Sequence, residues 1–219
     1  WVDGGGIAHD TGTRLAELNG DGLIDIIHGA DGPTSPETYL NNGNGGWTGL
    51  GTSRYYENSS LVSSAITHID VNGDGLSDRV YAPSGGTKNV QINDGYTFVS
   101  DSSWNVPGTL NDPQNDQGYR FGDINGDGLV DIGYGDSASS SPSVIYINNG
   151  TNWIGDTSWG PPENFIFTNG SNQRLQTGSV MIDINADGLA DTIGDNNSTF
   201  SRLNKGPRID LMTVATSSS

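Results

Sequence analysis

The chain alternates between short apolar runs and clusters of glycine, asparagine and aspartate, and no stretch has the apolar spacing of an amphipathic helix. Such a pattern predicts short β-strands joined by tight turns. The same order of runs and turns recurs four times along the chain. We therefore predict four structural units with four strands in each.

In every unit, a first strand enters an acidic phrase, a second strand leaves it, a third ends at an asparagine, and a fourth follows a glycine. The first strands are predicted at 12–18, 65–71, 118–124 and 178–184, and the second at 24–29, 77–82, 130–135 and 190–194. The third are predicted at 38–41, 89–93, 144–148 and 200–204, with irregular loops at 58–64, 107–115 and 160–172. Aromatic and apolar residues that open or follow the fourth strands are expected to pack between neighbouring sheets: Trp47, Phe98, Trp153, Ile209, Trp104 and Trp159.

The acidic phrase is the most regular feature of the chain. It reads ELNGDGLID at 17–25, DVNGDGLSD at 70–78, DINGDGLVD at 123–131 and DINADGLAD at 183–191. Each copy has side-chain oxygens at positions one, three, five and nine, a glycine at position six and a leucine at position seven. Alternate Asp and Asn side chains converge when the backbone curls, and the glycine permits the turn that returns the ninth residue. This oxygen-rich spacing predicts four calcium sites, each completed by the leucine carbonyl.

Two other interpretations of the phrase were weighed. Asn-Gly and Asp-Gly are strong hairpin signals, so the phrase also fits a plain turn between two strands. A turn alone does not need an aspartate at position nine, and the recurrence of all the oxygen positions favours calcium. An EF-hand fits poorly, because its twelfth position should hold a glutamate between two helices. The residues at that position are His28, Tyr81, Tyr134 and Gly194.

The distance between repeats predicts the fold. The first acids of successive phrases lie 53, 53 and 60 residues apart, which is typical of propeller blades rather than of helical repeats. One sheet has too little core to be stable alone, so the four units should pack around an axis. We predict an all-β, small four-bladed β-propeller of four-stranded blades. It forms a single domain over 1–219, with repeats at about 8–60, 61–113, 114–173 and 174–216.

The net charge of −17 argues against a nucleic-acid partner, because a phosphate-binding face needs clustered Lys and Arg. No apolar run approaches membrane-spanning length. The absence of cysteine selects no compartment. Calcium loops without the EF-hand glutamate suit millimolar calcium, so an extracellular or cell-surface location is expected. The chain begins at Trp1 without a signal-like segment, which suggests a mature or excerpted protein.

The phrase D-x-N-G-D-G-L-x-D, followed by a strand and an Asn-Asn-Gly turn at 41–43 and 148–150, resembles the FG-GAP/VCBS repeat family. Integrin α-subunit heads and many secreted bacterial proteins carry such repeats. The resemblance implies a calcium-binding β-propeller, often of about seven blades, so four units form a small propeller or part of a larger one. Two positions depart from the family pattern: Glu17 replaces the first Asp, and Ala186 replaces a glycine outside the hinge.

Carried onto this sequence, the resemblance implies about four calcium ions per chain. The ligands are Glu17, Asn19, Asp21, Leu23 and Asp25; Asp70, Asn72, Asp74, Leu76 and Asp78; Asp123, Asn125, Asp127, Leu129 and Asp131; and Asp183, Asn185, Asp187, Leu189 and Asp191. The segments 10–14, 116–120 and 102–107 and the tail at 203–216 are similar to VCBS tracts of bacterial RHS and toxin-complex proteins. This similarity implies a module cut from a longer polypeptide and carries no toxin activity with it.

No catalytic constellation accompanies these loops: the sequence has no cysteine, no G-x-S-x-G, no H-E-x-x-H and no phosphate-binding loop. We expect a non-enzymatic extracellular module for adhesion, scaffolding or surface and filament assembly, with a protein or glycan as ligand. A carbohydrate-binding lectin that stacks sugars on exposed tryptophans is the first alternative. The second is a fibre subunit whose apolar end at 209–215 completes a sheet edge of its own or of a neighbouring copy.

Overall fold

The computed structural model describes residues 13–28, 37–51, 54–55, 66–83, 85–110, 116–137, 143–161, 163–169, 174–195 and 199–206. These residues form strands, turns and loops without any helix, so the described part of the protein is all-β as predicted. It also lacks any helix with the length and apolar character that a membrane crossing requires.

Four antiparallel sheets form the blades, and in each the strands lie side by side in chain order. The first blade contains β1 (Arg14–Ala16), β2 (Asp25–His28), β3 (Glu37–Asn41) and β4 (Trp47–Gly49), and the second contains β5 (Ile66–Ile69), β6 (Asp78–Tyr81), β7 (Asn89–Asn93) and β8 (Phe98–Asp101). The third contains β9 (Tyr119–Gly122), β10 (Asp131–Tyr134), β11 (Val144–Asn148) and β12 (Trp153–Asp156), and the fourth contains β15 (Val180–Ile182), β16 (Asp191–Asp195) and β17 (Thr199–Arg202). The predicted strands of the repeat are thus confirmed wherever they fall on described residues.

One element was missed, and one prediction lies outside the described residues. A hairpin of β13 (Ile166–Thr168) and β14 (Arg174–Gln176) precedes the fourth blade, so the prediction of irregular structure throughout 160–172 is wrong at 166–168. The hairpin is held at the rim of the third blade, because the Phe165 N–H donates to the Gly135 carbonyl at 2.9 Å. The fourth strand of the last blade, expected to open at Ile209, falls outside the described residues.

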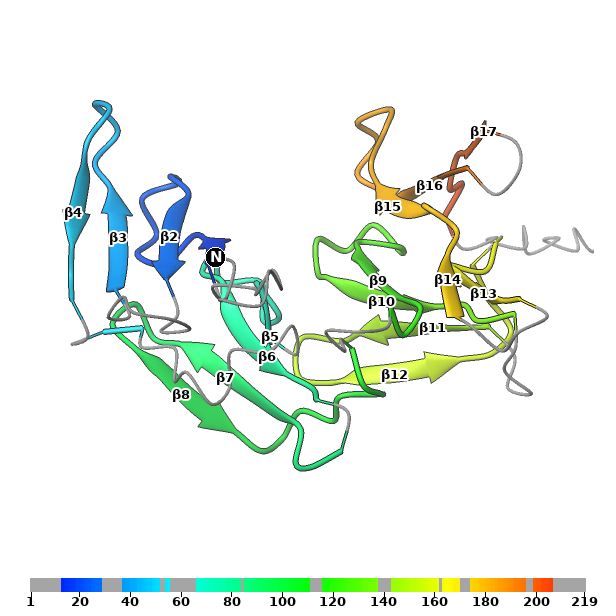
Figure 1. Ribbon diagram of the computed structural model, residues 1–219, viewed down its shortest axis with the longest axis horizontal. Helices are drawn as coiled ribbons and strands as arrows, with labels where there is room; N and C mark the ends of the chain where they lie inside the picture. The colour runs from blue at the N-terminus through cyan, green and yellow to red at the C-terminus, as the bar shows by residue number, and fades with distance from the viewer. Residues whose placement is uncertain are drawn as a thin grey trace, which may run out of the picture.

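The blades are arranged as a four-bladed β-propeller with β1, β5, β9 and β15 as the inner strands and β4, β8 and β12 at the periphery (Figure 1). Neighbouring blades contact each other through β1 and β5 and through β9 and β15. In Figure 1 the blades follow one another around an arc, with an opening between the first and the fourth blade.

The core lies between the blades, because each sheet buries its faces against its neighbours. Three clusters of buried residues join the first blade to the second, the second to the third, and the third to the fourth. The largest places Val80 and Val90 of the second blade against Ile132 and Trp153 of the third. No core cluster of the described residues joins the fourth blade to the first.

The tryptophans have different environments. Trp104 and Trp153 are buried and pack together with ring centroids 4.9 Å apart, which confirms the predicted packing between sheets. Phe98 is likewise buried and packs edge-on against Tyr55 at 5.4 Å. The same prediction is wrong for Trp47, which is 48% exposed because no described blade covers that face of the first sheet.

Asparagines at the ends of the third strands join the second, third and fourth blades to the blade before each. The Nδ2 atom of Asn148 donates to the Val71 carbonyl of the second blade at 2.7 Å and to the Val130 carbonyl of its own blade at 3.2 Å. Asn93 bonds to the Leu18 carbonyl and Asn204 to the Ile124 carbonyl in the same way. A recurrent contact of this kind sets the spacing of the blades and therefore the positions of the acidic loops.

Candidate metal sites

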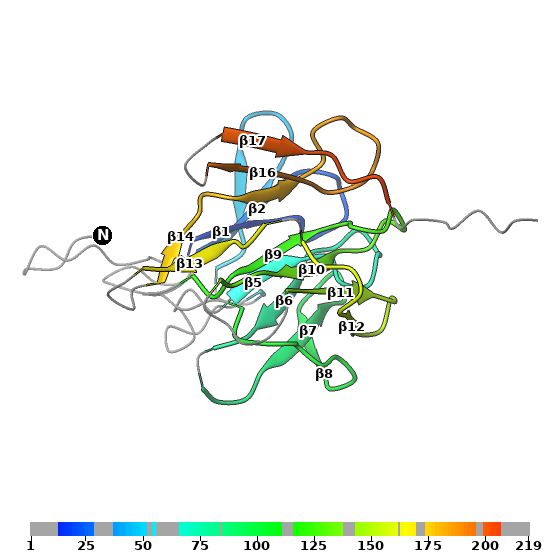
Figure 2. The same cartoon turned by 90° about the vertical axis from the view of Figure 1, so that its right-hand side faces the viewer.

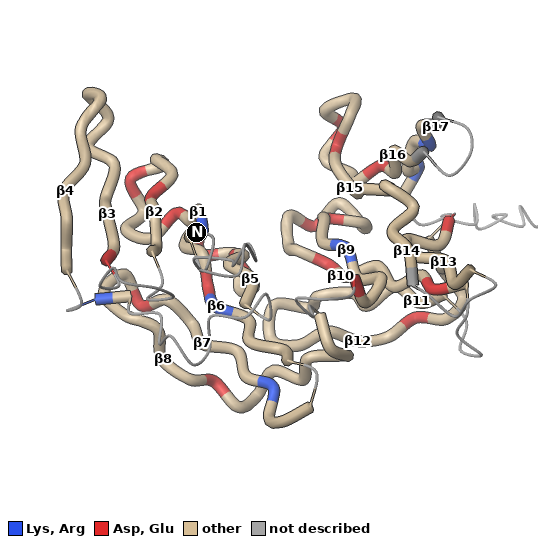
Figure 3. The backbone as a smooth tube through the Cα atoms, in the orientation of Figure 1, with Lys and Arg blue, Asp and Glu red and all other residues tan. Residues whose placement is uncertain are grey.

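The four acidic phrases form the hairpin loops between β1 and β2, β5 and β6, β9 and β10, and β15 and β16. All four loops project from one end of the propeller (Figure 2). Most of the acidic residues of the blades lie on these loops or at their bases (Figure 3). Adjacent loops also contact each other: the Ser77 N–H donates to the Glu17 carbonyl at 2.7 Å. The four loops that hold the predicted site residues therefore lie at one end of the propeller.

The loop of the second blade illustrates the geometry. Asp70, at position one, accepts hydrogen bonds from the N–H groups of Gly73 at 2.7 Å and Gly75 at 2.8 Å. The Nδ2 atom of Asn72 donates to Asp74 Oδ2 at 2.9 Å, and Asp74 Oδ1 accepts the Leu76 N–H at 2.9 Å. The side chains at positions one, three and five thus share one small curl of backbone, as the spacing predicted.

The sixth-position glycine is the hinge of this curl. Gly75 has a φ of 88°, in the left-handed region that residues other than glycine rarely adopt. The other three sixth-position glycines have φ values of 79° to 87°. The prediction that position six permits the sharp turn is confirmed in all four loops.

Position nine has a structural role in every blade. Asp25, Asp78, Asp131 and Asp191 have no exposed surface. In the third blade, Asp131 Oδ2 accepts the Ile124 N–H at 2.8 Å and Oδ1 accepts the Asn148 N–H at 2.7 Å. This carboxylate clasp joins the start of the loop to the end of the third strand. A turn between these strands does therefore need an aspartate at position nine, and the recurrence of that residue alone does not argue for metal.

Burial has an electrostatic cost at the clasp. Desolvation raises the pKa of Asp78 and of Asp131 to about 6, although backbone N–H donors from Asn93 and Asn148 act in the opposite direction. Desolvation also raises the pKa of Asp25. A cation close to these carboxylates would favour their charged form and oppose the shift.

The first loop departs from the others, as its glutamate suggested. Glu17 Oε1 accepts the N–H groups of Asn19 at 3.2 Å and Gly20 at 2.8 Å. The second oxygen, Oε2, is buried and makes no hydrogen bond among the described residues. A buried carboxylate oxygen without a donor is costly, and a cation is one group that would satisfy it.

The oxygen-rich side chains of the loops suit a hard cation, although their carboxylates do not converge on one centre. The residues at positions one, three and five are half-buried or exposed, whereas the aspartate at position nine is fully buried in every loop. Among the described residues, no three His, Asp or Glu side chains converge as a metal-binding group. The ligand set from positions one, three, five, seven and nine therefore stays a prediction. Positions one, three and five are the oxygens best placed to meet an ion from solvent.

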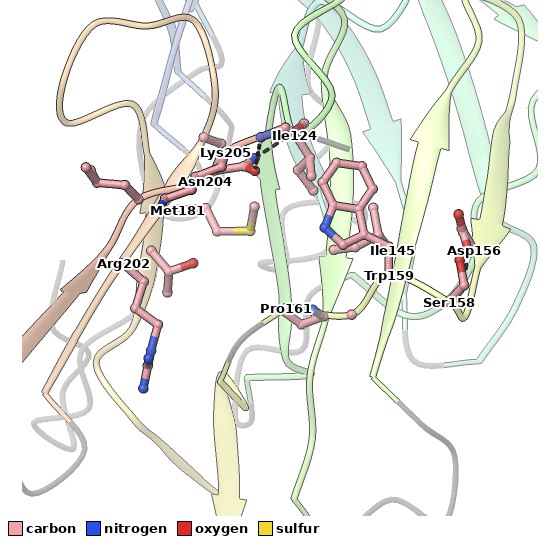
Figure 4. A pocket seen from close by; sticks show the side chains of 15 residues that line it. Ile124, Ile145, Asp156, Ser158, Trp159, Pro161, Met181, Arg202, Asn204 and Lys205 are labelled. Atoms are coloured by element: carbon pink, nitrogen blue, oxygen red, sulfur yellow. Dashed lines mark hydrogen bonds between the residues drawn. The ribbon is translucent and has the colours of Figure 1, made fainter. Parts of the chain in front are cut away.

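A cleft of about 940 Å³ opens between the third and fourth blades, and its lining includes Ile124 and Ala190 of the third and fourth acidic phrases. Trp159 and Ile145 lie on one side of it, with Met181 and Arg202 across from them (Figure 4). Trp159 follows β12 as Trp104 follows β8, but it is half-exposed, whereas Trp104 packs against Trp153. The expected packing role of Trp159 is therefore only partly met.

Sequence reasoning missed two kinds of functional contact. The third-strand asparagines each recur two residues before a glycine, and that recurrence was the available signal for their role between blades. Arg120 had been noted only as part of a resemblance. It forms a two-point ion pair with Asp116, at 2.7 and 3.0 Å, and its Nε donates to the Ser179 carbonyl at 2.9 Å. This arginine joins the third blade to the fourth.

No protein-family model matches the chain, and no curated protein matches it at a significant level.

Proposed function

We propose that the chain is a non-enzymatic, extracellular calcium-binding β-propeller module that serves in adhesion, scaffolding or surface assembly. The observation that carries the proposal is the repetition of one oxygen-rich loop at the same end of all four blades. Hydrogen bonds already hold the side chains at positions one, three and five within one turn of backbone. The buried, unpaired Oε2 of Glu17 supports the same interpretation for the first loop.

Calcium would act on this molecule as a structural ion. The loops bring acidic side chains together on a chain whose net charge is −17, and bound cations would reduce their mutual repulsion. Each loop joins the two inner strands of a blade, so an ion held there would stiffen the part of the blade that contacts its neighbour. A rigid propeller suits a scaffold or an adhesive surface. The resemblance to FG-GAP/VCBS repeats points in the same direction.

Thermal unfolding tests the calcium proposal. We expect the Tm to rise in about 1–2 mM calcium and to fall when a chelator is added, because ligands that bind only the folded state stabilise it by RT ln(1 + [L]/Kd). At calcium concentrations about 100-fold above Kd, each site would contribute about 2.7 kcal/mol. Magnesium should have a smaller effect, since it loses its water ligands reluctantly.

A pair of variants assigns the effect to the loops. Asp127→Asn removes a carboxylate at position five and should reduce the calcium-induced rise in Tm. Asp94→Asn is the matched control, because Asp94 lies in a turn outside the acidic phrases, where it accepts the Tyr96 and Thr97 N–H groups. A protein whose Tm does not respond to calcium, or responds equally in both variants, would refute the proposal.

Carbohydrate binding is a second candidate, favoured by the cleft between the third and fourth blades. A half-exposed indole beside charged and amide side chains is a combination that suits sugar rings. Two tryptophans that were possible platforms, Trp104 and Trp153, are instead buried between blades. We expect any glycan binding to be lost in Trp159→Ala and retained in Trp47→Ala. A glycan array without hits would exclude this candidate.

A further inference from the structure

At each internal interface, one face of a blade is covered by a face of its neighbour. The outermost faces of the first and fourth blades are of the same kind but lie at the two ends of the arc. Here the leading face is the side of a blade that packs against the preceding blade, and the trailing face is the side that packs against the next. In the third blade, Phe121, Tyr146 and Trp153 on the leading face pack against the core cluster shared with the second blade. The leading face of the first blade and the trailing face of the fourth have no such cover among the described residues.

The leading face of the first blade is apolar and exposed. Leu15 lies two residues before the first acid of its loop, where the third blade has Phe121, and Leu15 is 66% exposed. Trp47 opens the fourth strand, where the third blade has Trp153. Trp47 is 48% exposed, whereas Trp153 is 4% exposed.

The trailing face of the fourth blade is also apolar and exposed. Ile184 is 44% exposed, whereas Leu18, Val71 and Ile124, at the same position of the other loops, are almost completely buried. Ile182 and Leu203, on the same blade, are 54% and 53% exposed. Large apolar side chains grouped on one blade face indicate a contact surface.

A hydrogen bond that recurs at the internal interfaces has its donor at one end of the arc and its acceptor at the other. Asn93, Asn148 and Asn204 each donate to the second-position carbonyl of the preceding loop. Asn41 is the corresponding residue of the first blade, and among the described residues its Nδ2 donates to the Ile24 carbonyl of its own blade at 3.3 Å. The Ile184 carbonyl is the corresponding acceptor in the fourth blade. A blade placed against either end would complete this bond.

A third contact also recurs at each internal interface. The seventh-position leucine of each later blade packs over the fourth-position glycine of the preceding loop: Leu76 over Gly20, Leu129 over Gly73, and Leu189 over Gly126. Leu23 of the first blade and Ala186 of the fourth remain as the unmatched pair. A methyl group built on Gly20 would lie 3.5 Å from Leu76, an ordinary contact, whereas one built on Gly73 or Gly126 would lie 2.8 or 3.0 Å from the leucine above it. A leucine placed over Ala186 would therefore have to move the end of its flexible side chain slightly.

We propose that these two end faces form one interface, in which the trailing face of the fourth blade binds the leading face of the first blade of a second copy of this chain. The partner is identified by the repeat itself: the three internal interfaces show that a trailing face is covered by the leading face of a like blade. Such head-to-tail contacts close into a ring or continue as a filament. The inference concerns the blade faces and does not rest on calcium binding by the loops.

Sedimentation equilibrium tests the proposal directly. The chain has a mass of 23.0 kDa, and we expect concentration-dependent masses that are multiples of this value at about 150 mM salt, where the repulsion between acidic surfaces is largely screened. The measurement is made with calcium and again with a chelator, so that association is scored separately from ion binding. A monomer under both conditions up to about 100 µM would overturn the proposal, whether the end faces stay free or close on each other within one chain.

Two complementary variants distinguish this interface from other kinds of association. Leu15→Asp blocks the leading face, and Leu203→Asp blocks the trailing face; both positions are more than half exposed, so both variants should fold. Each variant alone should be monomeric, and an equimolar mixture should form a 1:1 heterodimer through the two intact faces. Trp47→Ser replaces Leu15→Asp if circular dichroism shows that the latter is unfolded.

The control is Val99→Asp, at an exposed apolar position on β8 that belongs to neither end face. It should associate like the unmodified chain. Self-association of Leu15→Asp alone or of Leu203→Asp alone would overturn the proposed contact between a trailing face and a leading face. A mixture that stays monomeric would overturn it as well.

Discussion

Replacing Asn148 by leucine is expected to lower the free energy of unfolding by about 3–5 kcal/mol. The amide of Asn148 is fully buried and donates to the Val71 and Val130 carbonyls, and its Oδ1 accepts the Gly150 N–H at 2.8 Å. Leucine would leave the Val71 carbonyl and the Gly150 N–H without this partner, whereas the Val130 carbonyl keeps the Trp153 indole N–H at 3.0 Å. Each unsatisfied buried group costs about 1–3 kcal/mol. The loss would also weaken the contact between the second and third blades, because one of the bonds joins them. Chemical denaturation of both proteins measures the difference.

The same substitution in the first blade is the control. Asn41 is only half-buried, and its amide has no preceding described blade to hold, since it bonds to the Ile24 carbonyl and the Gly43 N–H alone. Asn41→Leu should therefore cost about 1 kcal/mol, the value of an ordinary hydrogen bond. Equal losses in the two variants would mean that the contact between blades contributes nothing to stability.

Asp131→Ala is expected to destabilise the protein whether or not calcium is present. The substitution removes the clasp and leaves the buried N–H groups of Ile124 and Asn148 without an acceptor. Hydrogen bonds to a charged group contribute about 1.5–3 kcal/mol each. After allowance for the burial cost of the charge, we expect a net loss of about 3 kcal/mol. For a chain of this size, that corresponds to a fall in Tm of roughly 6–12 °C.

Asp127→Ala, four residues earlier in the same loop, should behave differently. Asp127 is exposed and accepts hydrogen bonds within the loop, including one from the Leu129 N–H at 2.9 Å. In chelator its Tm should lie within a few degrees of the unmodified protein, because exposed sites contribute little. In calcium it should lose much of the stabilisation that the ion confers on that loop. If both variants lost stability only in calcium, the clasp would be an ion ligand rather than a structural contact.

The repeat and its strands could be predicted from the sequence because they depend on local features. Alternation of apolar and turn residues and a spacing of 53 to 60 residues were enough to predict four sheets around an axis. The positive φ of the sixth-position glycines follows from the same local chemistry. These features are set within each nine-residue phrase, so no knowledge of distant contacts was needed.

The roles of individual residues could not be predicted in the same way, because they depend on what lies against them. Asp131 was expected to be an ion ligand, but its buried hydrogen bonds show a role that spacing alone does not reveal. Trp47 and Trp153 occupy equivalent positions, yet only Trp153 has a preceding described blade to cover it. The hairpin of β13 and β14 was missed because its pairing with the third blade involves Gly135, far along the chain.

Counting the bound calcium ions by native mass spectrometry tests the central claim most directly. After exchange into a volatile buffer with about 1 mM calcium, we expect a series of calcium adducts that ends at about four ions per chain. Asp127→Ala, or the equivalent change in another loop, should end the series one ion earlier. A chain that carries no calcium under these conditions would contradict the assignment of the four loops as calcium sites.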